Sequence, residues 1–210
     1  MDENILKNLT KYNISKYRNM LEIGTGPSTL IYASYLNNKN KLFVFEPQKK
    51  KFDMLNQKLK KNDLLNKVIV KQQACFCENK TKTMNNNEKD QKNINLSSVF
   101  LDFNEGNIKY VKLDDINYLY DIGFICCNTN KFDPWCFYGA KNLIKRNRPV
   151  ILYKKTYTKY FENNKKLNSE YSEIYKFNIK RYCILELGNY LYINDFTTRY
   201  SLLIPIENLY

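Results

Sequence analysis

An apolar run that ends in a Gly-x-Gly turn constrains the fold of this chain most strongly. The run begins at Met20, the turn is Gly24-Thr25-Gly26, and the residues from Ser28 onward are compatible with a helix. A strand, a glycine turn and a helix N-terminus leave backbone N–H groups free at the tip of the strand, where no side chain crowds a ligand. The stretch therefore predicts an α/β fold with a site for a nucleotide-like cofactor.

A second apolar run, which starts at Lys41, ends in the carboxylate of Glu46. This carboxylate follows the glycine turn at about the 20-residue spacing at which doubly wound folds hydrogen-bond ribose hydroxyls. Pro47 comes next and suits the first turn of a helix. The third glycine of the dinucleotide fingerprint is absent, which disfavours a nicotinamide cofactor. A glycine turn without a ligand is the alternative, and Glu46 speaks against it.

Length and composition indicate one globular domain over residues 1–210, with 43% hydrophobic and 15% aromatic residues. The net charge of +13 comes almost wholly from lysines spread along the chain. Such a charge permits an RNA partner, but lysine lacks the bidentate fork that reads bases, and no basic-aromatic repeat is present. An anionic small substrate is the commoner explanation. The Asn-, Lys- and Ile-rich usage is typical of AT-rich genomes, including those of large DNA viruses.

The six cysteines do not form the paired framework of a secreted domain, and the chain has no histidine. Neither Cys75-Phe-Cys77 nor Cys126-Cys127 has zinc-ligand spacing, so no metal site is predicted. The start of the chain lacks a signal peptide, and no apolar run reaches the length of a membrane span. We expect an intracellular, cytoplasmic protein without membrane contact, in the host cytoplasm if the source is viral. Its oligomeric state is left open.

Local patterns predict the elements of the first half of the chain. Residues 1–18 are expected to form an amphipathic helical cover over the cofactor, and 28–36 the first crossover helix. A helix from Pro47 to Lys61 is expected to stop at a left-handed Asn62. A third strand, 68–76, would bring Gln72, Gln73 and Ala74 near the adenine. Residues 79–95 are predicted to be a low-complexity surface loop, and 96–103 and 108–113 paired edge strands.

The second half continues the alternation of strands and helices. We expect a fourth strand over 120–127, a helix capped by Asp133 with Phe137, Ala140 and Ile144 on one side, and a fifth strand over 148–153. Strands at 184–187, 190–193 and 200–204 would close the sheet. The order predicts a Rossmann-like, mostly parallel seven-stranded sheet with helices on both faces and a C-terminal antiparallel hairpin.

An acidic residue just before the glycine turn, Glu22, resembles the first motif of class I S-adenosyl-L-methionine (SAM) methyltransferases. Residues 20–155 are similar to the FkbM-like family of these enzymes. The motifs that carry the resemblance are Phe45-Glu-Pro47 with Phe52 and Leu55, Lys61 to Val68 with Ala74, Leu113-Asp-Asp115, Gly139-Ala-Lys-Asn-Leu143, and Arg148-Pro-Val-Ile-Leu152.

The resemblance implies SAM as cofactor and methylation of a hydroxyl, often on a sugar. It implies a cofactor site made of Glu22, Gly24, Thr25, Gly26, Ser28, Glu46, Pro47, Gln73 and Ala74.

The chain departs from the family where the chemistry is expected. The family's Lys-Ile-Asp-Val-Glu-Gly-x-Glu strand end aligns with the residues from Cys126 to Asp133, and only the last acid is kept. Asp133, Lys131 and Asn128 are the catalytic candidates, with Asp133 first as base or substrate contact. A purely structural role for Asp133 at the start of its helix is equally compatible. Asp114, Asp115 and Lys154 are further candidates.

The sequence leaves three functions open. The first is sugar O-methylation, with a small-molecule or glycan acceptor whose nucleotide diphosphate would meet Lys131, Lys154 and Lys155. The second is ribose 2′-O-methylation of RNA, which the charge favours and the loss of Lys and Asp at Cys126 and Asn128 disfavours. The third is a non-catalytic module that binds SAM or a nucleotide. The sequence does not name the acceptor.

Overall fold

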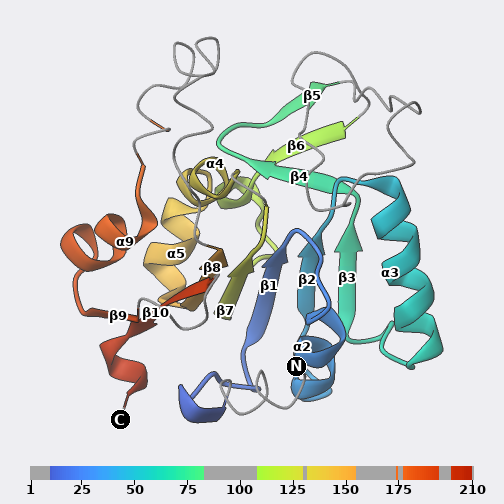
Figure 1. Ribbon diagram of the computed structural model, residues 1–210, viewed down its shortest axis with the longest axis horizontal. Helices are drawn as coiled ribbons and strands as arrows, with labels where there is room; N and C mark the ends of the chain where they lie inside the picture. Colours follow the sequence, from blue (N-terminus) through green and yellow to red (C-terminus); the bar gives the residue numbers. More distant parts are fainter. Residues whose placement is uncertain are drawn as a thin grey trace.

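The computed structural model describes residues 10–82, 108–129, 132–154, 174, 177–193 and 200–209. A seven-stranded sheet forms its centre, in the order β3-β2-β1-β7-β8-β10-β9 (Figure 1). The strand β10 runs antiparallel to β8 and β9, and the other pairs are parallel. The strands are β1 (Asn19–Ile23), β2 (Leu42–Phe45), β3 (Val68–Lys71), β7 (Ile122–Cys127), β8 (Val150–Lys154), β9 (Tyr190–Ile193) and β10 (Tyr200–Pro205). The predicted fold class is confirmed.

Helices cover both faces of this sheet. Residues of α2 (Thr29–Tyr35) and α3 (Lys49–Lys61) pack with Met20 on one face, and residues of α4 (Asp133–Tyr138) and α5 (Lys141–Asn147) pack with Leu21 and Ile23 on the other. Successive side chains of a strand point to opposite faces, so β1 supplies both clusters and is buried throughout. A continuous apolar run is the sequence signature of such a central strand.

The third strand is shorter than predicted. It leaves the main sheet after Lys71, because β2 ends at Phe45 and offers no partner beyond that point. The chain then forms β4 (Gln73–Phe76), whose backbone groups pair with β6 (Ile108–Lys112). The strand β5 (Lys80–Lys82), within the predicted loop 79–95, completes this second sheet. Figure 1 shows the second sheet lying across the carboxyl ends of the main strands. The predicted strand 96–103 lies outside the described residues.

The single helix predicted after Asp133 is instead two helices, α4 and α5. A Cβ atom on Gly139, between them, would lie 2.0 Å from the backbone oxygen of Phe76. The helix therefore breaks where the end of β4 crosses it, and only glycine permits that approach. The α5 N–H groups of Asn142 and Leu143 are accepted by the carboxylate of Asp114, at 3.1 and 2.8 Å. Asp114 lies in the 3₁₀ helix η2 (Leu113–Asp115).

Three predicted helix ends differ by one or two residues. The helix α3 begins at Lys49, so Pro47 precedes it, and Gln48 is its N-cap. Asp63, with a φ of 55°, takes the left-handed conformation expected of Asn62. Asp133 is the first residue of α4 and not its cap, which is Phe132. In each case local backbone contacts that sequence preferences do not resolve decide the boundary.

The segment 184–187, predicted as a strand, lies largely in a π-helical turn, η3 (Tyr182–Glu186), that continues α9 (Ile179–Arg181). The 3₁₀ helix η4 (Ile206–Asn208) follows β10. Among the described residues, none of the helices combines the length and apolar character needed to cross a membrane.

The described part of the N-terminal segment lies at the amino edge of the sheet, away from the glycine turn (Figure 1). The Ile14 carbonyl accepts a hydrogen bond from the Tyr35 hydroxyl at 2.8 Å, and Asn13 donates to the Asn208 carbonyl at 3.1 Å. For residues 10–18 the expected cover over the cofactor is therefore wrong, because Ile14 is buried against the end of α2. Residues 1–9 lie outside the described part.

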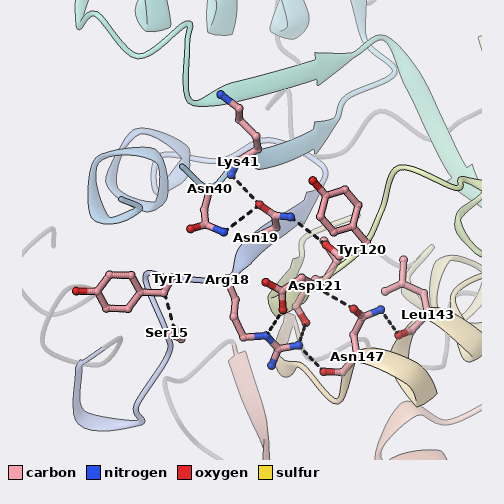
Figure 2. A network of polar contacts seen from close by, with 11 residues as sticks. Ser15, Tyr17, Arg18, Asn19, Asn40, Lys41, Tyr120, Asp121, Leu143 and Asn147 are labelled. Carbon is pink, nitrogen blue, oxygen red and sulfur yellow. Dashed lines mark hydrogen bonds and ion pairs between the residues drawn. The ribbon is translucent and has the colours of Figure 1, made fainter. Parts of the chain in front are cut away.

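Arg18 ties three elements together at this amino edge (Figure 2). Its Nε donates to Asp121 at 2.8 Å, and one terminal nitrogen donates to the carbonyls of Ile122 and Asn147 at 3.0 and 2.7 Å. A Cβ on Gly123 would lie 2.8 Å from that of Arg18, so the glycine makes room for the arginine. These contacts hold the beginning of β7 and the end of α5 against β1.

Candidate functional site

The glycine turn joins the carboxyl ends of three strands. Gly24 donates its N–H to the Phe45 carbonyl, and Asn128 donates its N–H to the Ile23 carbonyl, each at 2.9 Å. Gly24 has a φ of 78°, and a Cβ there would lie 2.6 Å from the Asn128 backbone oxygen. Both the conformation and the close approach require glycine. Gly24 thus fixes the ends of β1, β2 and β7 around one point.

Gly26 is in a different situation. Its φ is outside the left-handed region, and the nearest atoms to an added Cβ are Asn128 Nδ2 at 3.6 Å and Glu22 Oε1 at 3.8 Å. These are ordinary contact distances, so the described part of the chain does not require glycine here. A glycine that the fold does not need leaves space for a ligand to approach the backbone.

Glu46 is buried and holds the glycine turn from the end of β2. Its Oε2 accepts hydrogen bonds from the Thr25 N–H at 3.1 Å and the Thr25 hydroxyl at 2.8 Å. Its Oε1 accepts from the Gln48 N–H at 2.9 Å. A carboxylate has about four acceptor positions, so at least one stays available for a ligand hydroxyl. The spacing seen in the sequence therefore brings the predicted ribose acceptor to the predicted turn.

Glu22 lies beneath the turn, with 1% of its surface exposed. Burial, and secondarily the charge of Glu46, raise its pKa to about 8, although hydrogen bonds from Thr29 and the Gly26 backbone act in the opposite direction. Its Oε2 has no hydrogen-bond partner among the described residues. A buried polar atom in this state marks either an internal proton or a missing partner.

A cleft opens at the carboxyl edge between the glycine turn, β4 and α4. Its lining residues are Ile23, Gly24, Phe45, Glu46, Pro47, Gln48, Lys51, Ala74, Cys75, Asn128, Thr129, Phe132 and Cys136. The apolar members surround a flat space, and the polar members stand at its rim. Such a mixture suits an aromatic base with a polar attachment.

The structure brings five of the predicted site residues to this cleft, namely Gly24, Glu46, Pro47, Ala74 and Asn128. Thr25 and Gly26 belong to the turn beside it, and Ser28 is the N-cap of α2. Gln73 begins β4 and is not among the lining residues. Lys131 lies outside the described residues.

Several lining residues escaped the sequence reasoning. Thr129 directly follows Asn128 at the end of β7, and its position after a buried strand could have revealed it. Cys75, Phe132 and Cys136 reach the cleft only because β4 and α4 cross above the main sheet. No local pattern signals that crossing.

Asp133 is buried and is not among the lining residues of the cleft. A hydrogen bond with Asp133 contributes, after burial, to the raised pKa of the Cys127 thiol. The carboxyl group therefore lies behind the cleft wall, next to β7. The other acidic candidates have structural contacts: Asp114 caps α5, and Asp115 accepts a hydrogen bond from Asn79 at 2.7 Å.

The described residues contain no group of three or more metal-ligating acidic or cysteine side chains. SAM is the cofactor that the fold implies, and the residues present fit it. Gly26 leaves backbone space, Glu46 offers an acceptor position, and Glu22 has an unsatisfied buried oxygen.

No protein-family model and no curated protein matches the sequence. Solved structures do match. A methyltransferase FkbM from Methylobacillus flagellatus KT aligns with a TM-score of 0.54 and 12% identity, over 90% of this chain and 44% of that one. The fold is that of a methyltransferase. This chain therefore spans less than half the length of the FkbM structure.

Two further structures have the same fold and are closer to this chain in length. A candidate rRNA methylase from Clostridium thermocellum aligns with a TM-score of 0.51 and 10% identity, over 95% of this chain and 93% of that one. The O-methyltransferase TomG from Streptomyces achromogenes, involved in tomaymycin synthesis and solved with SAM, aligns with a TM-score of 0.51 and 12% identity, over 96% and 78%. At such low identity these likenesses concern the fold alone.

Proposed function

We propose that this chain is a SAM-dependent O-methyltransferase whose acceptor is a sugar hydroxyl, free, nucleotide-linked or glycan-borne. The observation that carries the proposal is the position of Glu46, held by Thr25 and Gln48 at the rim of the cleft and next to the glycine turn. An acceptor at the end of the second strand, beside a glycine turn, suits the ribose of an adenosyl cofactor.

In this proposal the strand ends divide the work on the cofactor. Glu46 accepts the ribose hydroxyls, Pro47 and Cys75 flank the base, and Gly26 lets the amino-acid end rest on the turn. Bound SAM supplies the methyl group. The protein's own contribution is to orient the acceptor oxygen in line with that group and to exclude water.

Asn128 and Thr129 are our choice for residues that contact the acceptor. Both line the cleft at the end of β7, and the Thr129 hydroxyl is buried without a partner among the described residues. Neutral amide and hydroxyl groups bind sugar hydroxyls as donors and acceptors. Asp133 remains the candidate base, and it can reach an acceptor only if its side chain turns away from Cys127.

Lysines near the cleft suit a nucleotide diphosphate on the acceptor. Lys51 lines the cleft from α3, and Lys154 ends β8 at the same edge of the sheet. Each would meet a pyrophosphate as a point charge. Replacing Lys154 with alanine should weaken the binding of a nucleotide-sugar while leaving cofactor affinity unchanged. Unchanged acceptor binding would remove Lys154 from the proposal.

Calorimetric titration with S-adenosylhomocysteine tests the cofactor site. We expect micromolar binding to the wild-type protein and at least a tenfold loss with Glu46→Gln, which keeps the size of the side chain but removes its charge. Thermal unfolding of both proteins controls for loosening of the Thr25 turn. Transfer of label from SAM to a panel of sugars, nucleotide-sugars and RNAs then identifies the acceptor. Absence of binding in the folded wild type refutes the enzyme proposal.

The net charge favours RNA as a second candidate acceptor. A protein that neutralises several phosphates loses affinity steeply as salt rises. Labelled RNA and a binding slope of several units in log Kd against log salt would support ribose methylation. Cofactor binding without transfer to any hydroxyl would instead support a non-catalytic module, which the burial of Asp133 favours.

A further inference from the structure

The buried carboxyl group of Glu22 has only acidic or neutral neighbours. Tyr32 faces it from α2, Cys126 from β7, and Glu46 from the end of β2. The Tyr32 hydroxyl donates a hydrogen bond to the Cys126 sulfur at 3.7 Å. Asp133, on α4, adds a further acidic group near Cys126. No lysine or arginine contributes to the electrostatic surroundings of Glu22 in the part of the chain that the structure describes.

An isolated carboxylate in such an environment is unstable. Removing a charge from water costs far more than a few hydrogen bonds return unless an opposite charge is near, so the group takes up a proton instead. One oxygen of Glu22 is satisfied by hydrogen bonds from Thr29 and Gly26, and the other has no partner among the described residues. With a pKa raised to about 8, Glu22 is mostly protonated at neutral pH.

Only a glycine separates this group from the ligand side of the turn. A Cβ atom on Gly26 would lie 3.8 Å from Glu22 Oε1, and nothing closer than 3.6 Å surrounds it. A charged ligand group that rests on the turn therefore acts on Glu22 through a few ångströms of protein. Charges interact strongly at such distances when water is absent.

We propose that Glu22 is a specificity-determining residue, which selects ligands with a positive charge at the glycine turn by releasing its proton when they bind. The inference rests on the proposed function, since SAM and S-adenosylhomocysteine both carry an α-ammonium group. On binding, the O–H bond of Glu22 breaks, the proton leaves to solvent, and the carboxylate balances the ammonium. A ligand without that group leaves Glu22 protonated.

Calorimetry at pH 7 in two buffers of different ionisation enthalpy counts the protons. With S-adenosylhomocysteine we expect a buffer-dependent heat that corresponds to the release of nearly one proton. With 5′-methylthioadenosine, which has the adenosine but no ammonium, we expect none. Infrared difference spectra provide a second readout, because the carbonyl band of a protonated carboxyl group should disappear when S-adenosylhomocysteine binds.

Glu22→Gln is the matched variant, since it copies the neutral form in shape and cannot ionise. We expect it to bind S-adenosylhomocysteine about tenfold more weakly and without proton release, and 5′-methylthioadenosine as the wild type does. Wild-type binding of S-adenosylhomocysteine with no buffer dependence overturns the inference and leaves the proposed function standing. Failure of both ligands to bind the wild type overturns both.

Discussion

Gly24 and Gly26 are two residues apart and are glycines for different reasons. Gly24 has a left-handed backbone and approaches the Asn128 carbonyl, whereas Gly26 has neither constraint. We predict that Gly24→Ala lowers the unfolding free energy by about 1–3 kcal/mol, the usual range for a strained backbone position. Gly26→Ala should keep wild-type stability but lower affinity for S-adenosylhomocysteine at least tenfold. Thermal unfolding and calorimetry measure the two effects.

The pair of glycine variants controls itself, because the same methyl group is added two residues apart. Equal loss of stability in both would show that Gly26 serves the fold. Full cofactor affinity in a stable Gly26→Ala protein would mean that the ligand does not rest on the turn.

Glu22 should make the stability of the protein depend on pH. Its pKa is about 8 in the folded protein against an ordinary value of 4.5, so the folded state holds the proton more tightly than the unfolded state. Stability is therefore full below about pH 4.5 and falls as pH rises through 8, by up to about 1.4 kcal/mol per pH unit. Urea unfolding from pH 5 to pH 8 measures the slope.

Glu22→Gln removes this titration and should flatten the slope over the same pH range. It should also make the variant more stable than the wild type at pH 8. An unchanged slope would show that Glu22 is ionised in the folded protein and has found a cation.

At the scale of elements, two motifs that carry the family resemblance meet in space. The aspartate of Leu113-Asp-Asp115 caps the helix that follows Gly139-Ala140, and Gly139 admits the end of β4. Asp114→Ala should cost about 0.5–2 kcal/mol in unfolding free energy, the range for a helix cap. It should leave affinity for S-adenosylhomocysteine unchanged.

Asp115→Ala is the control for the capping prediction, because Asp115 lies in the same turn and has no contact with α5 among the described interactions. Its exposed ion pair with Lys112 should contribute little. Loss of methyl transfer in a stable Asp114→Ala protein would restore Asp114 as a catalytic candidate.

At the scale of the whole molecule, the two edges of the sheet have separate tasks. The carboxyl edge holds the cleft, and the amino edge holds the contacts of Arg18 (Figure 2). Arg18→Ala should lower the unfolding free energy by about 2–3 kcal/mol, because it leaves partly buried carbonyls unpaired. It should leave the affinity of the folded protein for S-adenosylhomocysteine unchanged.

Arg18→Lys tests the geometry of this contact, since lysine keeps the charge but cannot reach Asp121 and two carbonyls with one fork. We expect an intermediate loss of stability. A change in cofactor affinity in either variant would show that the two edges are coupled through β1 and β7.

The sequence by itself determined the alternation of strands and helices, the glycine turn and the acid at the end of the second strand. These are local matters. A buried central strand needs a continuous apolar run, a left-handed turn needs a glycine such as Gly24, and parallel strands bring residues that follow them, such as Glu46 and Asn128, to one edge. Short-range preferences and the right-handed crossover therefore sufficed for the fold class.

Only the tertiary structure decided where the chain leaves these patterns. The early end of β2 sends residues 73–76 into a second sheet, Gly139 divides a helix beneath it, and Cys75 and Cys136 come to line the cleft. The state of Glu22 likewise depends on which groups surround it in space. Backbone pairing and desolvation act between residues far apart in the sequence, so no local pattern contains them.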